Sequence, residues 1–244
     1  MSIPLTGPVT LAQLQTEFGG TDPVSMNEYY RGGAFVPDSV RNAGIPTSGA
    51  ISLEQFRGSS KTATVTYAII GGGGAGGFGV GDGGEGNRGT FGASGQNSSI
   101  SGSGVQTITA AGGAGGQNCG GERGQTGFPG QSTFYGSGGA GGALNSNGSA
   151  APSTSYGAGG GGGGGDDGST YDAGGCSGFG GSAGTRLTGT VEVVYGTELS
   201  ITIGNGGGTN AVGFQGGAGA KGYCVISWDG NTSTFTSSGT VTLT

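Results

Sequence analysis

The sequence predicts a mainly β and irregular protein, in which a small N-terminal helical module precedes a small β core that carries a glycine-rich bundle. Three observations support this fold class. Residues 71–222 contain 57 of the 67 glycines of the chain. The apolar run Thr62–Ile70 stands directly before this glycine-rich field and alternates as a strand does. Residues 1–58 have an ordinary composition and contain signals for short helices.

The glycine-rich field has two physical interpretations. Glycine loses more conformational freedom on folding than any other residue, so the field would be a flexible linker unless its backbone groups bond to one another. In the ordered alternative it forms polyproline-II-like helices with three residues per turn, packed side by side through backbone hydrogen bonds. The aromatic residues within the field and the strands beyond it favour the ordered bundle. In such a bundle, substitution should be costly with a three-residue period along a run. Probes in the densest runs are Gly72, Gly113, Gly139 and Gly162.

The N-terminal module contains a duplicated motif, because residues 3–14 align with residues 45–56. Each copy begins with Ile-Pro, has a glycine four residues after the isoleucine, and then predicts a short helix capped by Thr10 or Ser52. In the first copy, Leu11, Leu14 and Phe18 share one helix face. The agreement over twelve aligned positions favours a real internal repeat over two independent helix starts.

A further helix start is predicted between the two copies. Ser25 has capping-box spacing to Glu28, which predicts a short helix over Tyr29 and Tyr30. A module of about 60 residues is near the lower limit for independent stability, so we expect it to dock on another protein. The polar joint at residues 59–61 is expected to be exposed.

The β core is predicted from apolar alternation and from turn residues. The predicted strands are Thr62–Ile70, Val105–Ala110, Leu187–Tyr195, Leu199–Ile203 and Tyr223–Trp228. Gly196-Thr197 lies between the third and fourth of these strands and predicts a hairpin that joins 187–195 to 199–203. Residues 234–243 alternate like a final edge strand that pairs with the same core or with a neighbouring subunit. The predicted domains are therefore 1–58, 62–230 and the C-terminal edge strand 231–244.

Composition and charge exclude several classes of function. Hydrophobic residues make up 31% of the chain and charged residues 9%, which is unlike a globular enzyme. A net charge of -6 disfavours binding to nucleic acid. No apolar run approaches the ~20 residues of a membrane span, and the N-terminus lacks the basic and apolar parts of a Sec signal. The chain has no histidine, the commonest general base and metal ligand. These features predict a protein that is not an enzyme and has no cofactor.

The most concentrated acidic spot is formed by Asp166, Asp167 and Asp172. Three carboxylates with nearby carbonyls could ligate Ca²⁺, but Asp is also common in the turns of a solvated loop tip. We favour the loop tip and predict no metal site.

Aromatic residues in the glycine-rich field divide into two groups. Phe78, Phe91 and Phe214 are embedded in glycine, which favours a structural role. Tyr156 and Tyr171 are flanked by Ser, Thr and Asp, and tyrosine among small polar residues is common in binding loops, which favours a contact role.

The sequence of the N-terminal module resembles the start of many tailed-bacteriophage virion proteins. The resemblance lies in Tyr-Tyr-Arg-Gly-Gly at 29–33 and Ile-Pro-Thr-Ser-Gly-Ala-Ile-Ser-Leu at 45–53, and covers about the first quarter of the chain. It implies that residues 1–58 dock the protein to other virion proteins. The candidate docking residues are Leu11, Leu14, Phe18, Tyr29, Tyr30, Leu53 and Phe56.

Residues 62–228 resemble the glycine-rich domains of phage tail proteins, with similar domains in some animal receptor ectodomains. The resemblance rests on the order of strand, glycine field, two strands, Gly-Asn-Gly-Gly-Gly at 204–208 and closing strand. It implies polyglycine-II helix bundles whose tip loops contact a host surface protein or glycan. The protein would then be a viral tail-fibre or adhesin-type component of the virion, made in the host cytoplasm, with a trimer as the expected form of any homo-oligomer. The alternative is a decoration or connector protein. The candidate receptor contacts are Tyr156, Tyr171, Asp166, Asp167 and Asp172.

Overall fold

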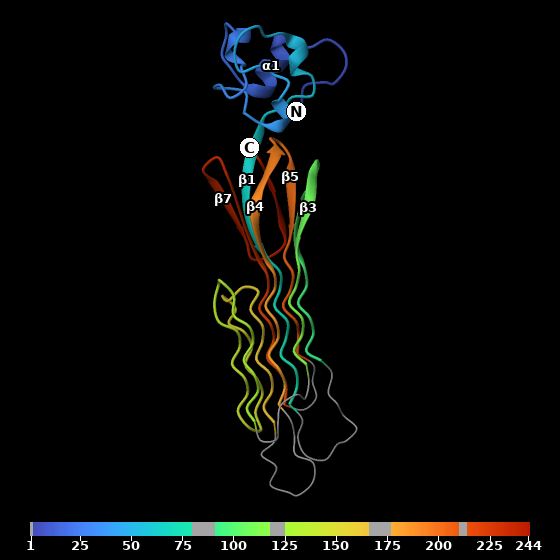
Figure 1. Cartoon of the computed structure of the whole chain (residues 1–244), viewed down its shortest axis with the longest axis vertical. Coiled ribbons are helices and arrows are strands. Elements are labelled where there is room, and N and C mark those ends of the chain that lie inside the picture. Colours follow the sequence, from blue (N-terminus) through green and yellow to red (C-terminus); the bar gives the residue numbers. More distant parts are fainter. Residues whose placement is uncertain (1, 80–90, 118–124, 166–176, 210–213) are drawn as a thin grey trace, which may run out of the picture.

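The computed structural model of the chain describes residues 2–79, 91–117, 125–165, 177–209 and 214–244. The molecule is elongated, and three parts follow one another along its long axis (Figure 1). The N-terminal module lies at one end, a β-sandwich lies in the middle, and the glycine-rich bundle extends from the sandwich. The described residues form two antiparallel four-stranded sheets and one short α-helix, which confirms the mainly β and irregular fold.

The two copies of the N-terminal motif begin their helices in the same way. In the first copy, α1 (Leu11–Phe18) is capped by Thr10, and in the second, the 3-10 helix η3 (Leu53–Phe56) is capped by Ser52. In both, the side chain of the glutamine three residues later accepts a bond of 2.8 Å from the backbone N–H of the capping residue. The capped helix starts predicted for both copies are therefore confirmed.

Two more 3-10 turns, η1 (Met26–Glu28) and η2 (Val40–Asn42), complete the module. The helix predicted over Tyr29 and Tyr30 is wrong, because η1 ends before them. Tyr29 instead enters the core, where its hydroxyl donates to the Gly19 carbonyl at 2.8 Å. The buried core of the module consists of Ile3, Val9, Leu14, Phe18, Tyr29, Val36, Ile45 and Phe56.

The joint between the module and the sandwich is buried, so the expectation of an exposed joint is corrected. Ser59 and Ser60 are both buried, although they are polar. The Ser60 N–H donates to the Asn42 side-chain carbonyl and the Asn42 amide donates to the Ser60 carbonyl, each at 3.1 Å. The Lys61 N–H donates to the Glu17 carboxylate at 2.8 Å. The chain therefore leaves the module with its backbone groups bonded to the module itself.

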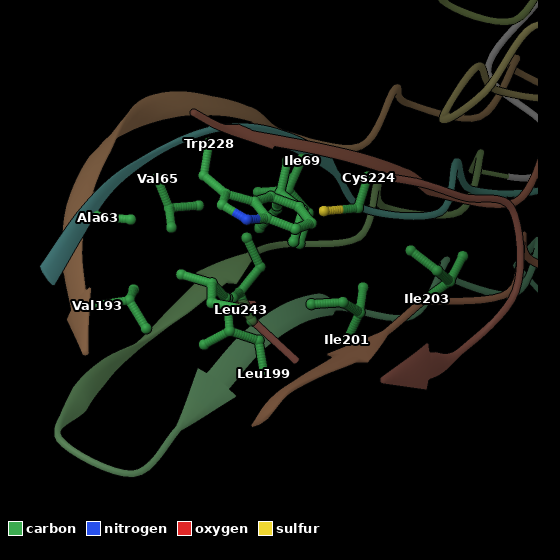
Figure 2. Packing of buried hydrophobic residues seen from close by; sticks show 13 residues of the cluster. Ala63, Val65, Ile69, Val193, Leu199, Ile201, Ile203, Cys224, Trp228 and Leu243 are labelled. Carbon is green, nitrogen blue, oxygen red and sulfur yellow. The ribbon is translucent and has the colours of Figure 1, made fainter. Parts of the chain in front are cut away.

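The sandwich is built from eight strands. They are β1 (Thr62–Ile70), β2 (Ser98–Gly102), β3 (Val105–Ala110), β4 (Arg186–Val194), β5 (Glu198–Thr202), β6 (Tyr223–Trp228), β7 (Asn231–Phe235) and β8 (Gly239–Thr242). One sheet has the order β4-β1-β6-β7 and the other β3-β2-β5-β8. Inward side chains of both sheets meet in one core around Trp228, Leu199 and Leu243 (Figure 2).

The hairpin predicted between β4 and β5 is wrong. β4 pairs with β1, whereas β5 pairs with β2 and β8, so the two strands belong to opposite sheets. Val193 and Leu199 are both buried and enter the shared core from the two sheets (Figure 2). The turn at Gly196, with φ of 81°, carries the chain across the sandwich. The C-terminal edge strand is likewise two strands, β7 beside β6 and β8 beside β5.

The first central segment of the bundle, residues 71–79, is surrounded by six other glycine-rich segments. Its N–H groups donate to three of them in rotation, with N···O distances of 2.8–3.2 Å. The recipients are 177–185 for Gly71, Gly74 and Gly77, 91–97 for Gly72 and Ala75, and 214–222 for Gly73, Gly76 and Gly79. Its carbonyl groups accept from the other three, which are 111–117, 157–165 and 203–209. This three-residue rotation is that of polyproline-II-type helices packed side by side.

The second central segment, residues 157–165, has the same coordination. Residues 159–164 donate to 125–131, 71–79 and 145–151, and residues 157–163 accept from 137–143, 177–185 and 214–222. Segments 177–185 and 214–222 therefore bond to both central segments. Seen in cross-section, the described segments therefore have a hexagonal arrangement. The two central segments lie side by side, and each is surrounded by six neighbours.

The central segments contain glycine at almost every position because no direction away from them is free. A Cβ atom added at any residue from Gly159 to Gly164 would lie 1.9–2.0 Å from a backbone atom of a neighbouring segment. The expected three-residue period of tolerated substitutions is therefore wrong for this run. The period is found instead at the perimeter, where Ala111, Ala114 and Gln117 are exposed and the glycines between them face inward.

Side chains replace missing neighbours at the perimeter of the bundle. Asn97 and Ser94 accept bonds from Gly112 and Gly115 on the adjacent segment, at 3.0 and 3.4 Å. Gln131 accepts from the Ala183 N–H at 3.1 Å. These polar side chains satisfy backbone donors that have no further helix to bond to.

The lateral packing predicts a sharp difference between two glycine-to-alanine substitutions. At Gly162 the new methyl group would lie 2.0 Å from the Gly178 carbonyl oxygen, whereas at Gly208 nothing lies within 4 Å. Gly162→Ala should lower the free energy of unfolding by about 3 kcal/mol, through over-packing and lost hydrogen bonds. Gly208→Ala should change it by less than about 0.5 kcal/mol. Chemical denaturation of both variants checks this, and equal effects would contradict the packing.

Candidate functional site

The candidate contact surface is the distal end of the bundle, defined as the end away from the sandwich. The segments on either side of each internal gap in the described chain end there (Figure 1). They end at Gly79, Gln117, Gly165 and Thr209, and the chain resumes at Phe91, Gln125, Ser177 and Phe214. Segment ends that are far apart in the sequence therefore lie at the same end of the bundle.

The described connection at the distal end is the turn Ala143–Ser146. The Ser146 N–H donates to the Ala143 carbonyl at 3.0 Å, and Asn145 has a positive φ of 58°. Leu144 projects from this turn with 38% of its surface exposed. The turn is anchored to the bundle, because the Asn145 N–H donates to the Gly165 carbonyl at 2.9 Å. An apolar side chain is thus held in a fixed position at the distal end.

Four predicted receptor contacts, Asp166, Asp167, Tyr171 and Asp172, lie outside the described residues. The chain reaches them from Gly165, whose N–H donates to the Gln125 carbonyl at 3.0 Å. Gly165 is the last described residue of the second central segment.

Tyr156, the fifth predicted contact, lies at the opposite end of the bundle. It precedes the second central segment, and Gly165 is nine residues further along the chain, or roughly 28 Å away at a rise of ~3.1 Å per residue. Tyr156 therefore does not lie at the distal end, and its grouping with residues 166–172, which lie outside the described residues, stays a prediction. Tyr156 stacks on Tyr223, with ring centroids 4.5 Å apart and an interplanar angle of 17°.

Tyr156 belongs to an aromatic shelf, which we define as Phe134, Tyr135, Tyr156 and Tyr223. The Tyr135 ring is 5.0 Å from that of Tyr223 and 5.3 Å from that of Phe134. Sequence reasoning missed Phe134 and Tyr135. Their flanking Ser132-Thr133 and Gly136-Ser137 are the same signal that selected Tyr156.

Other phenylalanines in the bundle divide differently from the sequence prediction. Phe78 is buried, as expected for a structural residue. Phe91 is 66% exposed, so the structural role predicted for it is corrected. Phe128 and Phe179 stack on adjacent segments with ring centroids 4.8 Å apart.

The candidate docking residues lie mostly inside the N-terminal module. Leu14, Phe18, Tyr29 and Phe56 are buried in its core and so cannot themselves contact a partner. Those that keep some exposure are Leu11, Tyr30 and Leu53. Large apolar side chains that do stand out from the module are Leu5 and Val40, at 77% and 84% exposure. Docking by residues 1–58 remains a prediction.

The resolved pKa shifts in the described chain lie away from the distal end. Burial, with the carboxylates of Glu28 and Asp22 nearby, raises the pKa of Tyr29. A hydrogen bond from Arg57 lowers the pKa of Glu54 and raises that of the arginine. Desolvation raises the pKa of the buried Cys224 thiol to about 12.

The described residues hold no group of three or more His, Cys, Asp or Glu side chains placed to bind a metal ion. Within the same residues, no helix has the length and apolar character needed to cross a bilayer. Comparison of the chain with family models, with curated proteins and with solved structures found no match.

The burial of Cys224 predicts that its thiol is unreactive in the folded protein. A pKa near 12 leaves almost no thiolate at pH 8, and the thiolate is the reactive form. In a Cys119→Ser, Cys176→Ser background, Ellman's reagent should label no thiol in the native state and one in urea. Rapid labelling without denaturant would show that the sandwich core opens readily.

Proposed function

We propose that the chain is a virion protein of a tailed phage, of the tail-fibre or adhesin type, that contacts the host surface with the distal end of its bundle. The N-terminal module attaches it to other virion proteins. The observation that carries the proposal is the separation of the two ends by one continuous body (Figure 1). A contact surface at one end and an attachment module at the other are what an attachment protein requires.

Backbone hydrogen bonds connect the two ends of the molecule without a break. β1 runs without interruption into the first central segment, and Gly71 continues the pairing by donating to the Thr185 carbonyl at 3.2 Å. Nine strand residues and nine bundle residues span roughly 55–60 Å at the rises of the two conformations. The buried joint at Ser60 extends this connection into the module.

The competing function is that of a decoration or connector protein, whose bundle packs between virion proteins and does not touch the host. The exposed Phe128, which stacks on Phe179 of the adjacent segment, favours this alternative, because it would suit lateral packing. The two functions differ in whether the isolated protein binds cells.

Adsorption measurements distinguish the two functions. The purified full chain should bind cells of the host and compete with phage adsorption. Leu144→Asp, at the distal turn, should weaken this competition at least tenfold, whereas Val40→Asp on the module should leave it unchanged. If the wild-type protein neither binds cells nor competes, the adhesin function is wrong and the connector function gains support.

The module should be required for incorporation into particles and not for folding of the remainder. The sandwich core contains residues from Ala63 to Leu243 and none from 1–58. A chain that lacks residues 1–58 should therefore fold, as judged by circular dichroism and cooperative melting, but be missing from purified virions. Particles that carry the truncated chain at the normal level would contradict the attachment role.

A further inference from the structure

We propose that the turn Thr133–Gly136 and Arg186 form a binding site for an acidic sugar, a hexuronate residue of a glycan, at the sandwich end of the bundle. The site is separate from the distal end. It does not depend on the proposed function, because no residue of the distal turn contributes to it.

The turn displays an aromatic side chain at its tip. Thr133 and Gly136 exchange two backbone bonds, of 2.9 and 3.3 Å, and enclose Phe134 and Tyr135 as the two central residues. Phe134 is 80% exposed, so its ring does not stabilise the core. A large apolar side chain displayed in this way is available to contact a ligand.

The exposed ring is held in place before any ligand arrives. The Thr133 hydroxyl donates to the Tyr156 carbonyl at 2.9 Å and accepts from the Tyr135 N–H at 3.1 Å. The Tyr135 ring packs edge-on against Phe134 with an interplanar angle of 89°. Because Phe134 and its turn are already ordered, the binding of a ligand there loses little conformational entropy.

The charged group beside Phe134 is positive, although the protein as a whole is acidic. The Arg186 guanidinium lies 5.0 Å from the centroid of the Phe134 ring and is exposed. Among the described residues Arg186 has no carboxylate partner. The carboxylate of its own strand, Glu192, is six residues away, or roughly 20 Å. In a chain of net charge -6, an exposed arginine without a carboxylate partner matches an anionic ligand.

A hexuronate satisfies both features of the site. The C–H groups of its ring can pack against the exposed Phe134 side chain, and its carboxylate can take a two-pronged hydrogen bond from the guanidinium. The sheet surface beside Arg186 offers hydroxyl groups for neighbouring sugars. Pairing across the sheet aligns them in a row of Thr190, Thr66, Ser227 and Thr232. A nucleic acid fits less well, because it needs cations for successive phosphates and the overall charge repels it.

Titration of the full chain with trigalacturonic acid tests the proposal, with a neutral galactose trisaccharide as the control ligand. The acidic trisaccharide should bind, and binding should weaken as salt is added. Arg186→Gln and Phe134→Ser should each weaken it at least tenfold. Phe91→Ser replaces another exposed phenylalanine and should leave the affinity unchanged. Both site residues are exposed, so the melting temperatures of the variants should match that of the wild type.

The proposal is overturned if trigalacturonic acid does not bind at millimolar concentration, or if the neutral trisaccharide binds equally well. It is also overturned if Phe134→Ser and Phe91→Ser behave alike, or if single-stranded DNA binds more tightly than the sugar. Failure at this site leaves host adsorption through the distal end unaffected, since the two are measured with different variants.

Discussion

The structure depends on one interaction, the lateral hydrogen bond between backbones that approach too closely for any side chain to lie between them. Where segments meet, an added Cβ atom would fall about 2 Å from a neighbouring carbonyl, as at Gly74 and Gly162. Each neighbour of a segment therefore requires glycine on the side that faces it. A segment with neighbours in every direction must be nearly all glycine, and residues 159–165 are. Glycine content along the chain thus reports how far inside the bundle a segment lies.

The sandwich makes this packing possible because it delivers the segments already aligned. Ordering a glycine-rich backbone costs more entropy per residue than ordering any other, and the bundle has few apolar side chains to offset that cost. Strands β1, β4 and β6 pair in register up to Ile70, Arg186 and Tyr223, and the glycine-rich segments continue from those ends. The hydrophobic core around Trp228 therefore stabilises the register of the whole bundle as well as its own sheets (Figure 2).

The sequence predicted the fold class, the capped helix starts and most strands, because these depend on local patterns. β2 was missed since Ile100 is its one large apolar residue. The β4–β5 hairpin failed because a Gly-Thr turn serves a crossing between sheets as well as it serves a hairpin. At the candidate sites, the exposure of Phe134 and the distance of Tyr156 from the distal end depend on how the turns at the sandwich end of the bundle pack against the sheet. That is long-range packing, which no local pattern encodes.

Hydrogen exchange of individual backbone amides tests the central claim most directly, because it measures the lateral bonds themselves. Amides of Gly73–Gly77 and Gly160–Gly164 should exchange as slowly as those of β1 and β6, since each donates to or lies among bonded neighbours. The exposed turn at Gly104 should exchange rapidly in the same protein. Central glycine amides that exchange at the rate of an unstructured peptide, while the strands stay protected, would contradict the bundle.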